Sequence, residues 1–277
     1  MAEIEAAARH RIFFLRVRRR IYVGQKPVDL PIESFGIVDP SMLLGELHTV
    51  RGEESCIKIQ LMPLSTTERN VAFEAALAFE TSELEFPFAL LGPDRRELVS
   101  PPEFWTQGSD LAELLDAGER HLRDFTRQII PTLKLSRNAI VFDPACSTGT
   151  FLVSIGEAFP EFQLYGADIS PRMVELARTR LQQVEVATIG QFSSTIAGSE
   201  LLVLRFLNAE VMRSEEAASY FAGFADRLPS KSYMLIMGYT PIAISIPYLA
   251  SQHGLSVIRS IGGWQGMIFQ FYVLRKR

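Results

Sequence analysis

From about residue 135 to the end of the chain, segments typical of strands alternate with segments typical of helices. Apolar runs suited to buried strands occupy residues 139–142, 162–167, 184–188, 201–207 and 233–237. Apolar positions at helical spacing, with capping and breaking residues around them, predict helices over residues 150–159, 170–183, 214–228 and 242–253. This alternation predicts an α/β fold with parallel strands and crossover helices that pack on the sheet.

The last two predicted strands depart from that rhythm. They cover residues 255–261 and 267–274, and only residues 262–266 separate them. Because a parallel connection needs a crossover of a dozen or more residues, we expect the final strand to run antiparallel. The sequence therefore predicts a doubly wound, seven-stranded, mostly parallel sheet whose last strand is antiparallel.

Residues before about 135 show no such alternation. Prolines interrupt their apolar runs, which predicts an irregular α+β extension. Apolar residues from 109 to 130 then recur at helical spacing, with Ser109 as the N-cap and Pro131 as the stop. We therefore predict an N-terminal α+β domain over residues 1–108 and a doubly wound domain over residues 109–277.

The composition is that of an ordinary globular protein, with 47% hydrophobic and 22% charged residues in 277. A formal charge of −4 argues against nucleic acid as a partner, because phosphate binding needs surplus positive charge. No uncharged stretch reaches the roughly 18 to 20 residues that cross a bilayer, so we expect no membrane partner and a cytoplasmic location. Cys56 and Cys146 share no metal-ligand spacing, so we expect neither a disulfide nor a metal site.

Six arginines lie between residues 9 and 20 of this otherwise acidic chain. A solvated face or a contact with another copy of the chain explains such a run better than a phosphate or membrane site does. A homodimer is therefore a candidate assembly.

The most informative segment is the predicted strand that ends in Asp143 and the turn that follows it. Small residues stand at alternate positions of this turn: Ala145, Ser147 and Gly149. They allow a tight turn and the close approach of a ligand to the main chain, and the next helix offers free N–H groups at its N-terminus. Nineteen residues after Gly149, a second strand ends in Asp168, where a carboxylate can accept hydrogen bonds from both hydroxyls of a ribose.

These two segments resemble the first two motifs of the class I S-adenosylmethionine-dependent methyltransferases. In that family the first motif is an acidic residue followed by three alternate glycines. Here Ala145 and Ser147 stand at the first two glycine positions, and Gly149 stands at the third. The resemblance covers about residues 138 to 274 and implies the Rossmann-like methyltransferase fold, with S-adenosyl-L-methionine as the cofactor.

The resemblance also implies roles for individual residues. Asp143 would hold the amine of the cofactor's methionyl part, directly or through a water molecule, and Asp168 would hold the ribose hydroxyls. Gln191 would contact the adenine amine, with Ser193 and Ser194 competing for that role. The turn would contact the sugar and the amino-acid part through Ala145, Cys146, Ser147 and Gly149. Ile169 and Asn208 complete the implied cofactor contacts, and Arg205 is a further candidate. Taken alone, Cys146 is a small apolar filler.

The function implied by the resemblance is that of an S-adenosylmethionine-dependent transferase acting on a small molecule, with methyl transfer as the leading reaction and secondary-metabolite biosynthesis as its setting. Residues 1–108 would form the lid and the substrate pocket. The catalytic residue stays open, with Asn208 and Tyr239 as candidates. No Asn-Pro-Pro-Tyr-type sequence follows the fourth strand, which disfavours adenine methylation in nucleic acid.

Other reactions stay open as well. Transfer of the aminocarboxypropyl group, or ring closure by the cofactor's own amine, would use the same site and release methylthioadenosine instead of S-adenosylhomocysteine. From a different class, residues 145–149 also match the nucleophile elbow of a serine hydrolase, with Ser147, Asp226 and His253 in hydrolase order. The polar pair Asp143-Pro144 disfavours that reaction, because the strand before such an elbow is buried and apolar.

Overall fold

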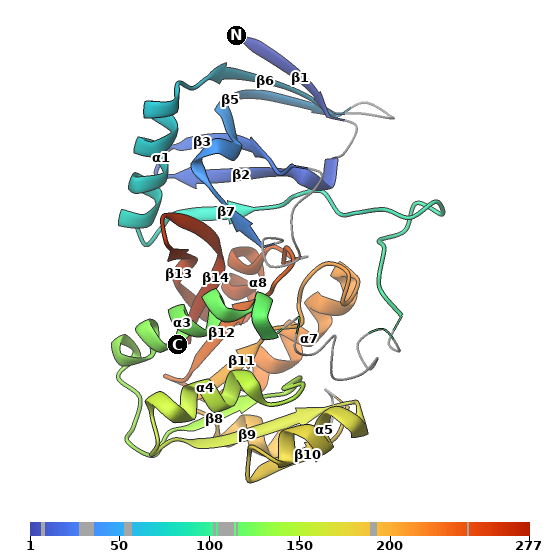
Figure 1. Cartoon of the computed structure of the whole chain (residues 1–277), viewed down its shortest axis with the longest axis vertical. Coiled ribbons are helices and arrows are strands. Elements are labelled where there is room, and N and C mark those ends of the chain that lie inside the picture. Colours follow the sequence, from blue (N-terminus) through green and yellow to red (C-terminus); the bar gives the residue numbers. More distant parts are fainter. Residues whose placement is uncertain are drawn as a thin grey trace.

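The computed structural model contains two β-sheets that lie one above the other along the long axis of the molecule (Figure 1). It describes residues 1–6, 9–27, 36–52, 57–101, 104, 114, 116–188, 193–242 and 244–277. Within these ranges, none of the helices combines the length and the apolar character that crossing a membrane would need. The chain ends its first sheet before residue 86 and builds most of the second sheet from residue 140 onward.

The N-terminal sheet has six antiparallel strands in the order β1-β6-β5-β3-β2-β7. Their bounds are β1 Ala2–Ala6, β2 Ile12–Val17, β3 Arg20–Gln25, β5 Leu43–Gly52, β6 Ile57–Pro63 and β7 Glu83–Glu85. Helix α1 (Thr66–Ala78) packs through Phe73 against Phe13 and Leu15, which recur at the two-residue period of a strand. The region is therefore α+β, as expected, but it forms a regular sheet with a helix, so the expectation of an irregular arrangement was wrong.

The second sheet follows the order β10-β9-β8-β11-β12-β14-β13. Its strands are β8 Ile140–Asp143, β9 Gln163–Asp168, β10 Gln183–Val186, β11 Leu201–Leu204, β12 Tyr233–Met237, β13 Leu255–Trp264 and β14 Met267–Lys276. Strands β8 to β12 pair in parallel, and β14 is antiparallel to both of its neighbours. The predicted doubly wound, mostly parallel sheet with an antiparallel last strand is therefore confirmed.

An eighth strand corrects the prediction of seven. Strand β4 (Ile37–Val38) comes from the N-terminal part of the chain but pairs with Ile268 and Phe269 of β14. It lies beyond the end of β12, which pairs with β14 only from Phe271 onward. A strand of two residues is too short to show any periodicity, so the sequence could not predict it.

Helices cover both faces of the second sheet. Helices α3 (Arg120–Ile129), α4 (Thr150–Ala158) and α5 (Pro171–Arg178) pack on one face, and α6 (Ser193–Gly198), α7 (Ser214–Arg227) and α8 (Ile246–Gln252) pack on the other. Short 3₁₀ turns occupy Arg9–Arg11, Pro40–Met42 and Ile130–Leu133. The four residues of β11 are all buried and alternate between the two cores, which explains why this strand is apolar throughout.

The two sheets meet where β7 and α1 contact β13 and β14. Ile261 and Ile268 of the second sheet belong to the same apolar core as the N-terminal strands. The buried side chain of Gln270 crosses this joint. Its Nε2 donates a hydrogen bond to the carbonyl of Leu84 at 2.9 Å, and its Oε1 accepts one from the N–H of Ile242 at 2.9 Å. The loop after β12 is therefore held in a fixed position relative to the N-terminal sheet.

Most of the described arginines near the N-terminus have partners within the chain. Arg16 pairs with Glu83, Arg20 pairs with Glu46, and Arg18 lies over the ring of Phe79. Arg11 differs from these, because it lines a cavity between the two sheets.

Candidate functional site

The turn after β8 depends on two backbone conformations in the left-handed region. Ser147 has a φ of 52° and Gly149 a φ of 81°, and α4 begins at the following residue, Thr150. A Cβ atom at Gly149 would lie 2.8 Å from Cδ1 of Leu181, so the position is closed to larger residues by packing as well as by conformation. The turn therefore brings bare main chain to the carboxyl end of β8, where parallel sheets bind ligands.

Asp168 lies at the tip of the neighbouring strand β9 and contacts this turn directly. Its Oδ2 accepts a hydrogen bond from the N–H of Ser147 at 2.9 Å, and its Oδ1 accepts one from the N–H of Ser170 at 2.9 Å. Burial raises the pKa of this carboxyl, while the two backbone donors act in the opposite direction. We expected Asp168 to lie beside the turn, and in the structure its carboxylate contacts the turn at Ser147.

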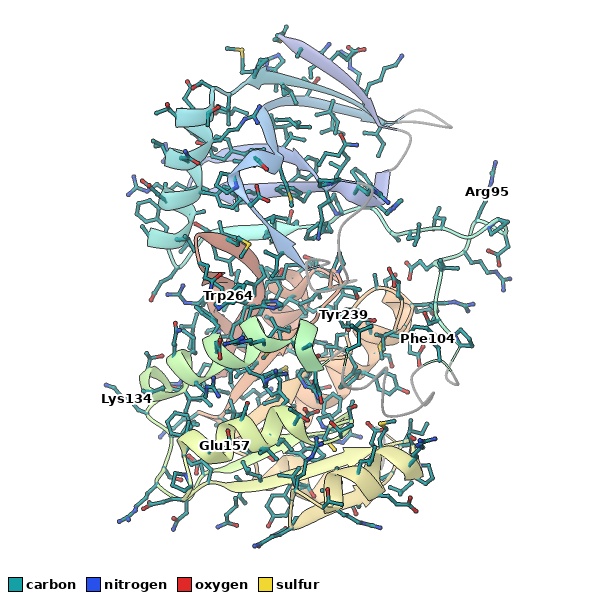
Figure 2. The ribbon with its side chains drawn as sticks, in the orientation of Figure 1. Arg95, Phe104, Lys134, Glu157, Tyr239 and Trp264 are labelled. Carbon is teal, nitrogen blue, oxygen red and sulfur yellow. The ribbon has the colours of Figure 1, made fainter. Side chains whose placement is uncertain are left out.

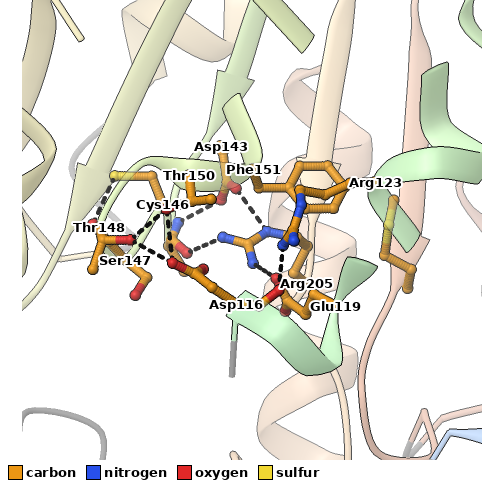
Figure 3. A network of polar contacts seen from close by, with 12 residues as sticks. Asp116, Glu119, Arg123, Asp143, Cys146, Ser147, Thr148, Thr150, Phe151 and Arg205 are labelled. Carbon is orange, nitrogen blue, oxygen red and sulfur yellow. Dashed lines mark hydrogen bonds and ion pairs between the residues drawn. The ribbon is translucent and has the colours of Figure 1, made fainter. Parts of the chain in front are cut away.

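Asp143 is fully buried and holds other parts of the chain with both of its oxygens (Figure 3). Oδ1 accepts from the N–H of Ala145 at 3.0 Å, and Oδ2 accepts from Nε of Arg205 at 2.9 Å. Arg205 also donates to the carboxylate of Glu119 and, from Nη2, to the carbonyl of Ala145 at 3.2 Å, with its guanidinium over the ring of Phe151. Asp143 thus orients the turn and Arg205, a role that the sequence did not predict.

Burial and charge shape this buried trio together. Burial alone would lower the pKa of Arg205, but the carboxylates of Asp143 and Glu119 more than offset it and raise that pKa. Burial raises the pKa of Glu119, against the attraction of Arg205. The guanidinium therefore stays charged, and it compensates the charge of the Asp143 carboxylate at the carboxyl end of β8.

Asp116 fastens the segment before α3 to the same turn. Its Oδ2 accepts hydrogen bonds from the hydroxyls of Thr148 and Thr150, at 3.1 and 2.7 Å, and its carbonyl accepts one from Nη1 of Arg123 at 2.6 Å. On the other side, Nη1 of Arg180 donates to the hydroxyl of Thr150 at 2.6 Å. The sequence did not single out Asp116 or Glu119, because both precede α3 in a stretch where acidic residues are ordinarily solvated.

Asn208 and Thr240 connect the loops that follow β11 and β12. The buried Asn208 donates from Nδ2 to the Thr240 hydroxyl, which donates to the carbonyl of Ala209 at 2.7 Å. The buried Oδ1 of Asn208 has no hydrogen-bond partner within the described part of the chain. The half-buried Tyr239 lies below the N-terminal sheet in the view of Figure 2, and burial raises its pKa, with Glu210 and Glu119 adding to the effect. Its phenol is therefore neutral at ordinary pH.

Cys146, Ile169 and Gln191 are also among the predicted site residues. Cys146 is buried and burial raises the pKa of its thiol, in keeping with a packing role. Its N–H donates to the carbonyl of Ala167 at 2.7 Å, which ties the turn to β9. Ile169 is 66% exposed. Gln191 lies outside the described residues.

A cavity of about 480 Å³ lies where the carboxyl ends of β11 and β12 face the N-terminal sheet. One wall comes from the loops after these strands: Ala209, Glu210, Met212, Ser214, Thr240, Pro241 and Ile242. The other walls come from the N-terminal part of the chain, chiefly Arg11, Lys26, Pro27, the segment 86–90, Glu97 and Leu98. The cavity is within the size range of small-molecule sites and adjoins Thr240, the partner of Asn208.

The hydrolase constellation does not assemble. His253 Nδ1 does lie 2.8 Å from Oδ1 of Asp226. However, both residues lie at the C-terminal ends of helices that lead into β12 and β13, at the edge of the sheet where the parallel strands begin. Ser147 follows β8, at the opposite edge, where the strands end. The pair of Asp226 and His253 therefore cannot act on Ser147 as the base that a serine nucleophile needs.

No protein-family model matches the chain. The chain is 32% identical over 259 residues to isonocardicin synthase from Nocardia uniformis subsp. tsuyamanensis, in an alignment that covers 92% of this chain and 85% of that protein. Among solved structures, it is similar to mitomycin 7-O-methyltransferase, with 14% identity, coverage of 63% of this chain and 60% of that one, and a TM-score of 0.47. It is also similar to an N-methyltransferase from Bradyrhizobium japonicum WM9 in complex with S-adenosyl-L-homocysteine, with 14% identity, coverage of 63% and 95%, and a TM-score of 0.46.

Proposed function

Because this chain belongs to the family of isonocardicin synthase, we take S-adenosylmethionine-dependent transfer to a small molecule as its activity and propose which residues carry it out. The observation that carries this assignment is the contact between the Asp168 carboxylate and the turn after β8. A carboxylate that could accept hydrogen bonds from a sugar and a bare stretch of main chain meet there, at the carboxyl edge of the sheet, next to the point where the strand order reverses between β8 and β11.

The residues of this edge fit the nucleoside part of the cofactor. A carboxylate has about four acceptor positions, and Asp168 uses two of them for Ser147 and Ser170, so both ribose hydroxyls can still donate to it. The main chain of Ala145, Cys146, Ser147 and Gly149 would line the sugar and the amino-acid part, and the exposed Ile169 would contact the base. Gln191 stays our candidate for the adenine amine. When bound, the cofactor supplies carbon atoms made electrophilic by the adjacent sulfonium.

Asp143 serves this site as a positioning residue in our proposal. Both of its oxygens are engaged by Ala145 and Arg205, so it acts on the amino-acid part of the cofactor through them. The resemblance implied that Asp143 contacts the amine either directly or through a water molecule, and in our proposal its effect on the amine is indirect.

The acceptor would occupy the cavity between the sheets, with residues 1–108 supplying its lid and much of its wall. Glu210 is the carboxylate we propose as the base for an acceptor hydroxyl or amine, because it lines the cavity and burial raises its pKa. The neutral phenol of Tyr239, influenced by Glu210, would orient the acceptor, and the unpartnered Oδ1 of Asn208 would accept a hydrogen bond from a ligand.

Methyl transfer is the leading reaction. The nucleophile of the acceptor would attack the methyl carbon in line with the sulfur, its proton would pass to the base, and S-adenosylhomocysteine would be released. Such a reaction needs chiefly positioning and desolvation of the nucleophile, which a cavity between two sheets provides.

A second candidate is transfer of the aminocarboxypropyl group, in which the nucleophile attacks the other sulfonium carbon and methylthioadenosine is released. Two observations support this second candidate. Asp143 accepts a hydrogen bond from Arg205, at the place where the amino-acid arm would lie, and the name of the relative, isonocardicin synthase, does not refer to methyl transfer. Chromatography of the nucleoside product separates the two reactions. Methylthioadenosine formed without any acceptor would instead indicate ring closure by the cofactor's own amine.

Calorimetry with S-adenosylmethionine and S-adenosylhomocysteine tests the cofactor site. We expect Asp168→Ala to weaken both ligands by about 10- to 100-fold, because two charge-assisted hydrogen bonds are lost. Asp226→Ala is the matched control, since it removes a carboxylate from the opposite edge of the sheet and should leave both affinities unchanged. The proposal fails if wild-type protein binds neither ligand or if Asp168→Ala binds them as tightly as wild type.

A further inference from the structure

Two buried carboxylates share one guanidinium at the carboxyl edge of the second sheet. Arg205 donates a hydrogen bond to Glu119 and, from Nε, another to Asp143 at 2.9 Å. Glu119 is 5% exposed, and Asp143 is fully buried. When both carboxylates are ionised, the three side chains together carry one excess negative charge. An excess charge in a region of low dielectric costs free energy, and a bound cation would offset that cost.

The excess charge is best assigned to Glu119. Asp143 accepts hydrogen bonds from Arg205 with one oxygen and from the N–H of Ala145 with the other. Glu119 accepts from Arg205 with one oxygen, and a carboxylate has about four acceptor positions. Burial raises the pKa of Glu119 against the attraction of Arg205, and the negative charges of Asp116 and Asp143 raise it further. The ionised form of Glu119 therefore benefits from a second cation.

The neighbouring charges do not supply that cation. Arg123 donates from Nη1 to the carbonyl of Asp116 at 2.6 Å, so the positive charge of Arg123 lies beside the negative charge of the Asp116 carboxylate. Asp168 adds a further carboxylate at the tip of β9. Arg180 contacts the turn through Thr150, but it is exposed, so water screens its charge. The carboxyl edge of the sheet thus keeps a negative excess.

Glu119 lies at the end of the site that the cofactor's amino-acid arm would reach. The tips of β9, β8 and β11 follow one another in the sheet, and Arg205 comes directly after β11. A ligand with its ribose at Asp168, on β9, extends its arm over the turn after β8 toward Arg205 and Glu119 (Figure 3). Carboxylate and arm would therefore meet on the β11 side of the turn.

The segment that carries Glu119 is held to the turn at both of its ends. Asp116 accepts hydrogen bonds from the hydroxyls of Thr148 and Thr150, and Arg205 links Glu119 to the carbonyl of Ala145. The carboxylate of Glu119 is thus fixed in position before any ligand arrives, which lowers the cost of binding one.

We propose that Glu119 binds the α-ammonium group of the cofactor's amino-acid arm and makes the site selective for ligands that carry this charge. An ammonium group has three N–H donors, so it can donate to Glu119 while Arg205 keeps its own hydrogen bond. This assignment rests on the proposed function, and it adds the residue that recognises the amine.

Three ligands that differ only in the arm test this contact. They are S-adenosylhomocysteine, its deaminated analogue in which hydrogen replaces the α-amino group, and methylthioadenosine, which lacks the amino-acid end. Calorimetry with the full chain at pH 7, where the amine is protonated, measures the three affinities. We expect wild type to bind S-adenosylhomocysteine at least about tenfold more tightly than the deaminated analogue, because a charge-assisted hydrogen bond is lost.

Glu119→Gln keeps an oxygen for Arg205 and removes the charge. In this variant the preference for S-adenosylhomocysteine should disappear, while methylthioadenosine should bind as it does to wild type. Glu119→Asp keeps a carboxylate and should retain a preference. Asp124→Asn is the matched control, because it removes a carboxylate of α3 that pairs with Arg127, and it should behave as wild type. Thermal unfolding checks that each variant is folded.

The outcomes separate this proposal from the proposed function. Equal binding of S-adenosylhomocysteine and its deaminated analogue to wild type overturns the role of Glu119 and leaves the cofactor site standing, and this comparison needs no variant. A preserved preference in Glu119→Gln overturns the role as well. Weakening of all three ligands by the same factor in Glu119→Gln would show that Glu119 only supports the turn. If wild type binds none of the three ligands, the proposed function fails and this assignment fails with it.

Discussion

Arg205 keeps a full charge inside the protein because two carboxylates and a backbone carbonyl surround it. Its side chain is 7% exposed, and that of Asp143 is completely buried. Burying such a group is favourable only while every partner is present, since loss of one leaves an uncompensated charge in a region of low dielectric. The trio therefore makes the geometry of the cofactor turn sensitive to a single side chain.

We expect Arg205→Ala to lower the free energy of unfolding by about 3 to 5 kcal/mol, because Asp143 is then buried without its cation. Arg180→Ala is the control. Arg180 is exposed and contacts the same turn through Thr150, so its loss should cost about 1 kcal/mol or less. Urea unfolding followed by circular dichroism measures both. Equal losses for the two variants would show that the buried trio adds nothing beyond a surface contact.

His121 sets a pH dependence of stability. Its ring is buried 4.7 Å from the ring centre of Phe269, and its Nε2 has no hydrogen-bond partner among the described residues. Burial lowers the pKa of His121 from 6.5 to about 4, so the folded protein resists a proton that the unfolded chain accepts. Stability is therefore complete above pH 6.5 and falls as the pH drops toward 4, by up to about 3 kcal/mol.

We expect His121→Phe to flatten this part of the stability profile. The measurement is urea unfolding at several pH values between 7 and 4. His10 is the internal comparison, because its pKa is also lowered but it is only partly buried, so His10→Phe should leave most of the slope in place. A profile for His121→Phe that runs parallel to wild type would assign the slope to other groups.

Among single residues, the sequence analysis identified site residues that follow strands, but it missed Asp116 and Glu119, which precede α3. Asp168 could be placed because a carboxylate that follows an apolar strand stands out against its neighbours. Glu119 and Asp116 could not, because burial of a charge depends on Arg205 and Thr150, which lie far away in the chain. The position of Asp143 at the end of a strand could be predicted, but the hydrogen bond that it accepts from Arg205 could not.

At the scale of elements, buried strands were the easiest to predict. The expected bounds of β12 and α7 lie within one residue of the observed ones. In both segments, the spacing of the apolar residues and the residues that end the element indicate the same bounds. The fourth strand was expected to reach residue 207 but ends at Leu204, since Phe206 and Leu207 are buried in the loop that follows. The helix expected from residue 242 begins at Ile246, because Ile242 bonds to Gln270 instead. Burial by itself does not distinguish a strand from a packed loop.

The turn between β13 and β14 is tighter than expected. The two strands run to Trp264 and from Met267, so only Gln265 and Gly266 connect them, with φ values of 50° and 78°. Two consecutive left-handed residues form the turn that matches the twist of a β-hairpin. Glycine therefore suits the second position for its conformation alone, because a Cβ there would meet nothing within 4 Å.

We expect Gly266→Ala to lower the free energy of unfolding by about 1 kcal/mol, because alanine disfavours a positive φ. Gln265→Asn should raise it by a few tenths of a kcal/mol, since asparagine tolerates this conformation better than glutamine. Thermal unfolding of the two variants should shift in opposite directions. Shifts of the same sign would mean that the side chains at this turn matter more than its backbone.

At the scale of the whole molecule, the cavity between the sheets could not be predicted from the sequence. Its walls combine residues near position 11 with residues near position 241, and no local pattern joins segments so distant in the chain. The prolines of the first half suggested irregular structure, yet two of them, Pro27 and Pro87, line the cavity. The proposed acceptor site thus depends on how the two sheets are joined.

Gln270 is the polar contact that we expect to matter most for this joint. Gln270→Leu leaves the N–H of Ile242 and the carbonyl of Leu84 without their partner, which should cost about 2 to 4 kcal/mol of stability. Hydrogen exchange should show a faster Ile242 amide, while S-adenosylhomocysteine binding is kept. Gln252→Leu, at an exposed position, is the control. Unchanged exchange at Ile242 would show that the loop is held by its apolar neighbours alone.

Strand β4 has a consequence for engineering. The chain leaves its first sheet after β3, lends Ile37 and Val38 to β14, and then returns to build β5, β6 and β7. A chimaera that takes its first hundred residues from a relative, in order to change the acceptor, would also import this short strand. Its partners Ile268 and Phe269 would then have to be transplanted with it, so the smallest exchangeable module is not contiguous in sequence.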